Sequence, residues 1–575
     1  MDDRRPLVCP VLVGRDDLLA LADRRIAEVL AGDGRFLLLA GEAGVGKTRL
    51  LGAMERRAGV AGFRTVRGGA YPSDSQVPAA ILIDLARALQ RQPDLADVGM
   101  RLDRRLADAA SDDGDHLAGA HDPRRRRRLL VLDVAEILAE IGAAKPAAVA
   151  LEDLHWSDDL TLEILEALAR RVPEERLLVI GTYRSDELFP RAPMREWRSR
   201  LLARRQAEEV RLGRLDAADT ATMTMLLSGS GLPPARDVAE AVHARTDGIP
   251  LHVEELLAVL AGSADLVAAE VRQADVPESV EDAILARLAH PTDAAAIVAR
   301  AGAVIGRSFD LDLLASVTGQ APGDLSAPLA ELADHFILLP AHAPGRYGFR
   351  HGLICDAIYG AIPEPERRRL HARTAEAASA RSDVGVDAFL ALHFERAGRL
   401  EDAFSAALAA ADGASALSSH SEARELYACA LRTAPADLDA ATRARILEAF
   451  GTSAAATDDN ETASEAFAAA GEAYREAGQI LAAAGVVGPL VAARHLLGDG
   501  LEARTDRLRA ALREIPAAPG LHGPSADPAA DRVRARLLSA LSAAYMLDRR
   551  LDEGIAYGIE ARLQAESVGD RATEH

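Results

Sequence analysis

The segment GEAGVGKT at residues 41–48 constrains this chain most strongly, because it matches the phosphate-loop pattern G-x-x-x-x-G-K-T in full. An apolar stretch, residues 35–40, precedes it, and an amphipathic stretch with Leu50, Leu51 and Met54 follows it. This order predicts a strand, a glycine-rich loop and a helix, the setting in which such a loop binds phosphate. We therefore expect the chain to bind a nucleoside triphosphate.

The residue types of this loop suit a triphosphate held together with magnesium. Its glycines allow successive backbone N–H groups to turn toward the β-phosphate. Lys47 is one of only two lysines among 67 basic residues, and its compact ammonium would bridge the β- and γ-phosphates. The hydroxyl of Thr48 would join the oxygen ligands of Mg²⁺. The expected nucleotide-binding residues of the loop are Gly41, Glu42, Ala43, Gly44, Val45, Gly46, Lys47 and Thr48.

Two carboxylates follow a second apolar stretch, residues 147–151. A phosphate site needs one carboxylate to orient Mg²⁺ or its waters and another to polarise the attacking water. By position, Glu152 would hold the metal shell and Asp153 would be the catalytic base. A shorter aspartate is usual where Glu152 stands, so the opposite assignment of roles stays open.

A third apolar stretch, residues 177–182, leads to Arg184. An arginine at the end of a neighbouring strand can contact the γ-phosphate, which would make Arg184 a second catalytic residue. Its alternative is a surface ion pair with Asp186 or Glu187.

Charge and cysteine content restrict the partners and the compartment. The formal net charge is 67 − 88 = −21, so these residues are not expected to bind DNA or anionic lipid directly. The three cysteines lack metal-type spacing, which indicates a reducing compartment. No export signal follows Met1, and no run of about eighteen apolar residues occurs, so we expect a cytoplasmic protein without a membrane span.

Apolar strands separated by helices predict an α/β domain with a parallel sheet. Its first helix is expected to start at an N-cap, Asp16, and residues 92–122 to form helix fragments and loop. Residues 217–269 have a helical pattern. Five arginines, 124–128, open another helix as a solvated face or, alternatively, as a nucleic-acid patch.

The second half of the chain is predicted to be mostly helical. Residues 346–349 form a strand-like stretch within a helical segment that runs to about residue 380. The remainder has small-residue patterns similar to degenerate tetratricopeptide-type helical hairpins. A loop rich in proline and glycine, residues 516–531, interrupts this array.

Several short motifs occur in one order and together resemble the large ATP-binding regulators of the LuxR family, a branch of the signal-transducing STAND ATPases. Most of these motifs are weak alone, but the ordered set is highly specific, and the resemblance covers essentially the whole chain. They are VGRD at 13–16, the phosphate loop, LEDLHWSD at 151–158, GTYRSDEL at 181–188, DGIPL at 247–251 and FRH at 349–351.

This resemblance implies an AAA-like nucleotide-binding domain at residues 1–215, a helical lid at 216–275, a winged helix at 276–380 and tetratricopeptide-like repeats at 381–575. It also implies that ADP locks a closed monomer and that ATP with an inducer opens it for self-association. Full-length members usually end in a helix-turn-helix DNA-binding domain. No such signature precedes His575, and we expect the chain to be a fragment or a shortened homologue.

The resemblance also implies further nucleotide contacts. Val13, Gly14 and Arg15 would border the adenine, Pro250 would pack on the base, and His351 would reach the β-phosphate. Each contact has a plainer alternative: Arg15 as a surface residue, Pro250 as a helix start, and His351 as a packed polar residue.

We therefore interpret the chain as an ATP-dependent signalling switch with slow Mg²⁺-dependent hydrolysis, the regulatory part of a transcriptional regulator. Its expected partners are ATP or ADP, an unknown inducer or protein on the repeats, and other copies of the chain. One alternative is an ATPase that remodels macromolecules, which would need an arginine supplied across a ring. The other is a helical scaffold with a vestigial nucleotide site.

Overall fold

The computed structural model describes residues 9–69, 77–110, 123–185, 192–229, 232–260, 271, 292–335, 337–340, 345–350, 352–380, 386–515 and 527–569. They form two compact units. The first comprises Met1–Arg399 with Ala416–Ser418, and the second comprises Leu400–Ser415 with Ser419–His575. Within the described ranges, no helix is both long enough and apolar enough to cross a bilayer.

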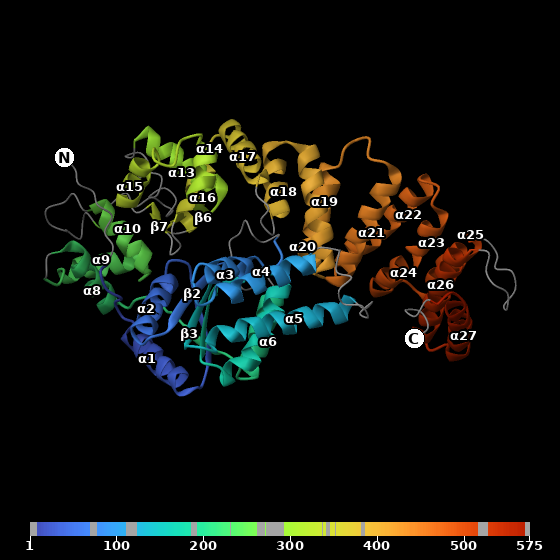
Figure 1. Ribbon diagram of the computed structural model, residues 1–575, viewed down its shortest axis with the longest axis horizontal. Helices are drawn as coiled ribbons and strands as arrows, with labels where there is room; N and C mark the ends of the chain where they lie inside the picture. The colour runs from blue at the N-terminus through green and yellow to red at the C-terminus, as the bar shows by residue number, and fades with distance from the viewer. Residues whose placement is uncertain are drawn as a thin grey trace. The chain divides into compact units, whose positions relative to one another are not determined.

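The first unit begins with a five-stranded sheet in the order β2-β3-β4-β1-β5, and every neighbouring pair is parallel (Figure 1). The predicted parallel α/β domain is therefore confirmed. Its strands are β1 (Arg35–Gly41), β2 (Arg64–Gly69), β3 (Ala147–Glu152), β4 (Leu177–Arg184) and β5 (Glu208–Arg211). Its helices are α1 (Asp16–Ala31), α2 (Lys47–Val60), α3 (Ala80–Gln90), α4 (Ala96–Ala110), α5 (Pro123–Ala139), α6 (Asp159–Arg171) and α7 (Ala192–Ala203).

Helices cover both faces of this sheet, which explains why its strands read as continuous apolar runs. Successive side chains of a strand point to opposite faces. In β1, Leu37 and Leu39 belong to the core shared with α1 and α2, whereas Phe36 and Leu38 belong to the core on the other face. Both sets are buried, as expected of a parallel sheet.

The carboxyl ends of the parallel strands bring the predicted site residues to one edge. β1 ends at Gly41, β3 at Glu152 and β4 at Arg184. In the register of β1 and β4, Gly41 lies opposite Arg184. Because β4 lies between β3 and β1, the phosphate loop and the carboxylates flank a single strand.

Four local expectations are wrong. Arg15, not Asp16, is the N-cap of α1, and Asp16 lies in the first turn, where its charge favours the helix dipole. Residues 96–110 form one helix, α4, rather than fragments. The expected loop at 516–531 ends early, because Asp527 caps α26 (Pro528–Leu547) through Ala529 and Ala530 N–H. β5 was not expected, because Glu208, Glu209 and Arg211 make this edge strand polar.

Two further regions complete the first unit. Helices α8 (Ala217–Ser228), α9 (Arg236–Thr246) and α10 (Pro250–Leu260) form a bundle around a common core. The small-sheet region, residues 292–380, has an antiparallel sheet in the order β6-β8-β7. Its elements are α13 (Asp293–Ile305), β6 (Ser308–Asp310), α14 (Leu311–Thr318), α15 (Ser326–Asp334), β7 (Leu338–Pro340), β8 (Arg346–Phe349), α16 (Gly352–Ala361) and α17 (Glu364–Ser379); α18 (Val386–Ala397) follows.

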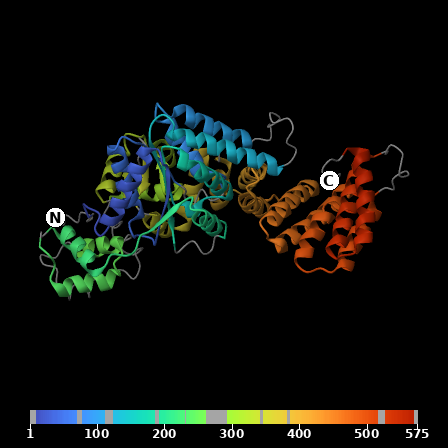
Figure 2. The same ribbon diagram turned by 90° about the horizontal axis from the view of Figure 1, so that it is seen from below.

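The second unit is helical throughout its described residues, as predicted, and consecutive helices pack against one another (Figure 2). Its helices are α19 (Leu400–Ala416), α20 (His420–Thr433), α21 (Ala440–Ala456), α22 (Asn460–Glu476), α23 (Ile480–Gly485), α24 (Val487–Leu496), α25 (Leu501–Glu514), α26 and α27 (Leu551–Val568). Alanines fill much of this core, including Ala454, Ala463 and Ala535. Small side chains allow the helices to approach closely.

The edge strand β5 is held by an ionic cluster in addition to the packing of its one buried apolar residue, Val210. Glu209 accepts hydrogen bonds from Tyr183 of β4 and Arg198 of α7, and from Arg211 Nε at 2.7 Å. Burial alone would raise the pKa of Glu209, but these hydrogen bonds outweigh burial and lower the pKa from 4.5 to about 2. The folded state therefore favours the ionised carboxylate.

We predict that Glu209→Gln destabilises this domain by about 1–3 kcal/mol at neutral pH. Because the folded pKa is below the unfolded one, the stabilisation is present above pH 4.5 and is lost as the pH falls toward about 2. Both tryptophans, Trp156 and Trp197, pack in this domain, so their fluorescence during urea unfolding reports its stability. Glu196→Gln, at an exposed position, is the control. An unchanged midpoint at pH 7 would contradict the prediction.

Candidate functional site

The phosphate loop turns through two glycines whose backbone requires a residue without Cβ. Gly44 has φ 76° and Gly46 has φ 102°, in the left-handed region. Lys47 is the first residue of α2 and is buried, and its Nζ donates to the carbonyls of Gly41 at 2.7 Å and Glu42 at 2.8 Å. The ammonium therefore lies inside the loop, at the N-terminus of the helix.

The first residues of α10 lie on this loop. Leu251 N donates to the Gly44 carbonyl at 3.3 Å. A Cβ added to Gly44 would lie 3.0 Å from the Leu251 Cβ and 3.2 Å from Ile249 Cγ2. The glycine thus permits a close approach between the phosphate loop and the α8–α10 bundle.

Glu152 lies beside Thr48 at the carboxyl end of β3. Burial raises the pKa of Glu152 to about 7, and the negative charges of Asp153 and Glu55 add to this shift. The positive charge of Arg67 and a hydrogen bond with Thr48 oppose it. Arg67 Nη1 lies 3.4 Å from Glu152 Oε1. A hydroxyl next to a carboxylate in a negatively charged surrounding fits a hard cation, so Thr48 and Glu152 could hold Mg²⁺.

Asp153 follows β3 in a left-handed backbone conformation, with φ 56°. Its N–H donates to Thr182 Oγ1 of β4 at 3.0 Å. Its carboxylate lies between two basic side chains: Oδ1 is 3.8 Å from Nδ1 of the buried His155, and Oδ2 is 3.8 Å from Nη1 of Arg307. Arg307 comes from the small-sheet region, so two parts of the first unit meet at the predicted base.

The structure places Arg184 at the end of β4, opposite Gly41 and half-buried. This is the expected strand end next to the phosphate loop. Asp186 and Glu187, the alternative partners, lie outside the described residues, as does His351. The roles expected for Arg184 and His351 therefore stay predictions.

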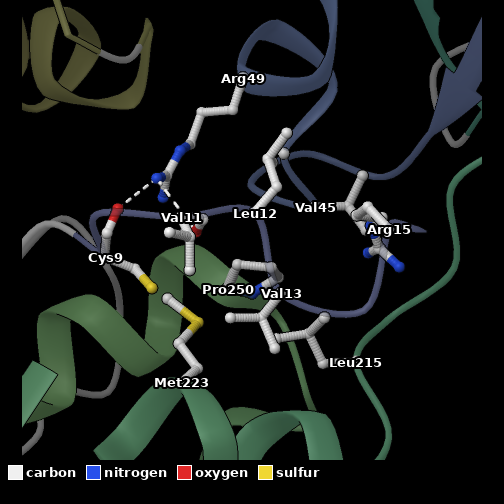
Figure 3. A pocket seen from close by; sticks show the side chains of 11 residues that line it. Cys9, Val11, Leu12, Val13, Arg15, Val45, Arg49, Leu215, Met223 and Pro250 are labelled. Carbon is white, nitrogen blue, oxygen red and sulfur yellow. Dashed lines mark hydrogen bonds between the residues drawn. The ribbon is translucent and has the colours of Figure 1, made fainter. Parts of the chain in front are cut away.

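A pocket opens beside the phosphate loop where the adenine was expected. Figure 3 shows that its walls come from the N-terminal segment, the loop, α2 and the α8–α10 bundle, with the sulfur atoms of Cys9 and Met223 facing each other. The lining residues are Cys9, Val11, Leu12, Val13, Arg15, Val45, Gly46, Arg49, Leu215, Met223 and Pro250. Val13, Arg15 and Pro250 are thus brought together as expected.

The structure bears differently on the plainer alternatives for Arg15 and Pro250. Arg15 is only 8% exposed and donates to the Gly213 carbonyl at 2.6 Å, so it is not an ordinary surface residue. Pro250 is the first residue of α10 and also lines the pocket, and its packing on the base stays a prediction. Gly14, at φ 65°, has no room for a Cβ, which would lie 2.1 Å from Asp219 Oδ2.

Glu254 of α10 is a buried carboxylate that the sequence did not single out. It is 4% exposed and accepts from Cys9 N at 3.0 Å, from Arg49 Nη1 at 3.0 Å and from Arg350 Nη2. These donors come from the pocket wall, from the phosphate-loop helix and from the end of β8. One carboxylate therefore joins the nucleotide-binding sheet, the α8–α10 bundle and the small-sheet region.

Sequence reasoning had little chance of finding these contacts. Glu254 lies among buried apolar residues of α10, Val253, Leu256 and Leu257. A charged residue within this apolar pattern is the signal in the sequence that could have indicated a buried carboxylate. Arg307 lies far from Asp153 along the chain and belongs to no recognisable motif. Their importance comes from the tertiary contact alone.

Comparison with known proteins supports the assignment of this segment. A family model described as "AAA ATPase domain" matches residues 11–180. An uncharacterized protein of Rhizobium meliloti (strain 1021) is 29% identical over 458 residues, which are 73% of this chain and 42% of that protein. This chain thus spans less than half the length of that relative.

Two solved structures have remote similarity. The signal-transduction ATPase with a tetratricopeptide repeat sensor from Pyrococcus horikoshii has 13% identity and a TM-score of 0.43, covering 100% of this chain and 80% of that chain. Cdc6p from Pyrobaculum aerophilum has 14% identity and a TM-score of 0.32, covering 65% and 97%. These scores are too low to establish a shared fold. The segment that carries the phosphate loop and both carboxylates matches an AAA ATPase domain.

Proposed function

We propose that this chain is an ATP-binding signal-transduction switch, the regulatory and sensor portion of a LuxR-type transcriptional regulator that acts in the cytoplasm. One observation carries the proposal: residues of the α8–α10 bundle and of the small-sheet region contact the phosphate loop, the base-side pocket and the predicted catalytic carboxylate. A nucleotide in this site would therefore lie next to the α8–α10 bundle and the small-sheet region, the two parts that would move.

The phosphate loop and the pocket beside it would together set the orientation of the nucleotide. Its phosphates would lie in the loop 41–48 against the N-terminus of α2, with Lys47 as their cation. Its base would lie at the pocket between Val13 and Pro250, which has a volume of about 20 Å³ and would have to widen to admit it. Thr48 and Glu152 would hold Mg²⁺, which offsets the phosphate charge, Asp153 would orient the attacking water, and Arg184 would contact the γ-phosphate.

The remaining regions take the roles that the sequence resemblance implies. We assign residues 1–215 to the nucleotide-binding domain, 216–275 to a helical lid, 276–380 to a winged helix and 381–575 to tetratricopeptide-like repeats. The antiparallel sheet β6-β8-β7 with its helices supports the third assignment, and the paired helices of the second unit support the fourth. An inducer or protein partner would bind the repeats.

The nucleotide would act as a switch by making different contacts in the closed and open states of the protein. A ligand shifts an equilibrium only by binding two states with different affinity. Here the closed state depends on Glu254, whose partners include Arg49 of the phosphate-loop helix and Arg350 at the end of β8. Opening would break these ion pairs and expose surfaces for self-association. With the net charge of −21, DNA binding is not assigned to these residues.

Lys47→Ala should abolish ATP and ADP binding while the fold is retained, because it removes the ammonium from the loop. Calorimetry with MgATP, with MgADP, and with ATP in the presence of EDTA measures this. Removing Mg²⁺ should weaken ATP binding more than ADP binding, because the metal held by Thr48 and Glu152 would offset the larger charge of the triphosphate.

Lys145 provides a matched control, since it is the only other lysine and forms a surface pair with Asp94 at 3.8 Å. Lys145→Ala should bind like the wild type. Absence of nucleotide binding in the wild type would favour the scaffold alternative. Hydrolysis at about 1–100 s⁻¹, typical of kinases, would favour the remodelling ATPase.

Glu254→Gln should shift the chain toward an open, self-associating form. The variant keeps the side-chain shape but loses a charge that two arginines contact, which weakens the closed state by about 1.5–3 kcal/mol or roughly tenfold to a hundredfold. Light scattering with ADP measures the mass, and limited proteolysis measures the exposure of the interdomain surface. Glu240→Gln, on the neighbouring helix α9 in an exposed pair with Arg236, is the control. If the variant stays as monomeric as the wild type and is cleaved by the protease no faster, this role of Glu254 is refuted.

A further inference from the structure

Arg307, at the start of the small sheet, contacts the predicted catalytic carboxylate. Its side chain is 11% exposed, and its Nη1 lies 3.8 Å from Asp153 Oδ2. Its Nη2 lies 3.3 Å from Asp356 Oδ2 of α16, and its Nε is buried without a hydrogen-bond acceptor among the described residues. A guanidinium therefore lies within ion-pair distance of one oxygen of Asp153, although 3.8 Å is too long for a direct hydrogen bond.

The backbone around Arg307 is built to hold this orientation. Gly306, which ends α13, has φ 141° and ψ −175°, a conformation open essentially to glycine alone. Its N–H still donates to the Gly302 carbonyl at 2.9 Å, so the helix is capped while the chain turns sharply. The Arg307 carbonyl accepts from Phe349 N at 2.9 Å, which fixes the residue against β8. A residue with Cβ at position 306 would not allow this turn without strain.

Arg307 and Arg350 leave the small sheet at the same end. β6 and β8 are antiparallel, with Ser308 opposite Gly348, so the residue before β6 and the residue after β8 are neighbours. One arginine contacts Asp153 and the other contacts Glu254. Movement of the small-sheet region away from the nucleotide site would withdraw both.

A guanidinium at this position competes with water for the Asp153 carboxylate. For hydrolysis, a carboxylate oxygen must accept a hydrogen bond from the water that attacks the γ-phosphate. Arg307 cannot accept that proton, because guanidinium groups have only donors and stay protonated. While Arg307 faces Oδ2, its positive charge lies beside the oxygen that would bind the nucleophilic water, and it lowers the affinity of the Asp153 carboxylate for a proton.

We propose that Arg307 restrains ATP hydrolysis in cis by occupying the Asp153 carboxylate while the small-sheet region is docked, and that undocking releases the restraint. This inference rests on the proposed function, because it assumes that the site binds ATP and that Asp153 assists hydrolysis. It names Arg307 as a positioning residue that acts through Asp153. It also gives a physical reason for slow turnover in the closed state.

The test measures single-turnover hydrolysis of MgATP by the full chain at several ATP concentrations. Arg307→Gln should raise the maximal rate about tenfold to a hundredfold, up to the lower end of the roughly 10²- to 10⁴-fold that a general base contributes, and leave the half-saturating ATP concentration unchanged. Arg307→Lys keeps the charge and should stay close to the wild type. Arg300→Gln is the matched control, since Arg300 lies on α13 and forms a partly exposed ion pair with Glu366.

A double variant separates action through Asp153 from a general loosening of the fold. Adding Arg307→Gln to Asp153→Asn should leave the rate at the level of Asp153→Asn alone. If the glutamine variant does not fold, Arg307→Met repeats the test with the apolar stem retained.

An unchanged rate in Arg307→Gln would overturn the inference, and so would a lower rate, which would make Arg307 an assisting arginine instead. A rate gain that persists in the Asp153→Asn background would also overturn it. If the wild type does not bind ATP in calorimetry, the proposed function itself fails. If it binds and hydrolyses ATP but the Arg307 variants do not differ, only this inference fails.

Discussion

The arrangement of the nucleotide site depends on one buried carboxylate, that of Glu254. A charge removed from water is tolerated only when it is paired and hydrogen-bonded. Glu254 meets this requirement through Arg49, Arg350 and the Cys9 N–H, which belong to different parts of the first unit. If Arg49 or Arg350 moves away, the buried carboxylate loses one of its two cationic partners. The contacts of Glu254 therefore stabilise the docked arrangement while all of them are formed, and losing one of them costs free energy.

This connection explains how events at the phosphates could reach the rest of the first unit. Arg49 lies on α2, which starts at Lys47, and the start of α10 contacts Gly44. Arg350 continues β8, whose partner strand β6 follows Arg307. The phosphate loop, Glu254 and the small sheet thus form a continuous set of contacts that ends at Asp153. Such a set can have two states, because its ion pairs either form together or separate together.

The sequence predicted the parts of this site that depend on local pattern. The phosphate loop follows from eight consecutive residues, and the strands β1, β3 and β4 follow from apolar runs that the double-sided burial requires. The edge strand β5 was missed because it contains only one buried apolar residue, Val210, and is otherwise held by polar contacts of Glu209 with Arg198 and Tyr183. Glu254 and Arg307 were missed for a related reason: an ion pair between distant segments leaves no periodicity or spacing in the sequence.

The central claim is that the nucleotide decides whether the small-sheet region stays docked on the nucleotide-binding domain. Spin labels at Val60→Cys on α2 and Ile297→Cys on α13, both exposed positions, measure the separation of these parts, and the three native cysteines are buried. The account predicts one short distance distribution with ADP, a second, longer distribution with ATP, and a larger share of the longer one when Glu254→Gln is added. The same distribution in all three samples would contradict it.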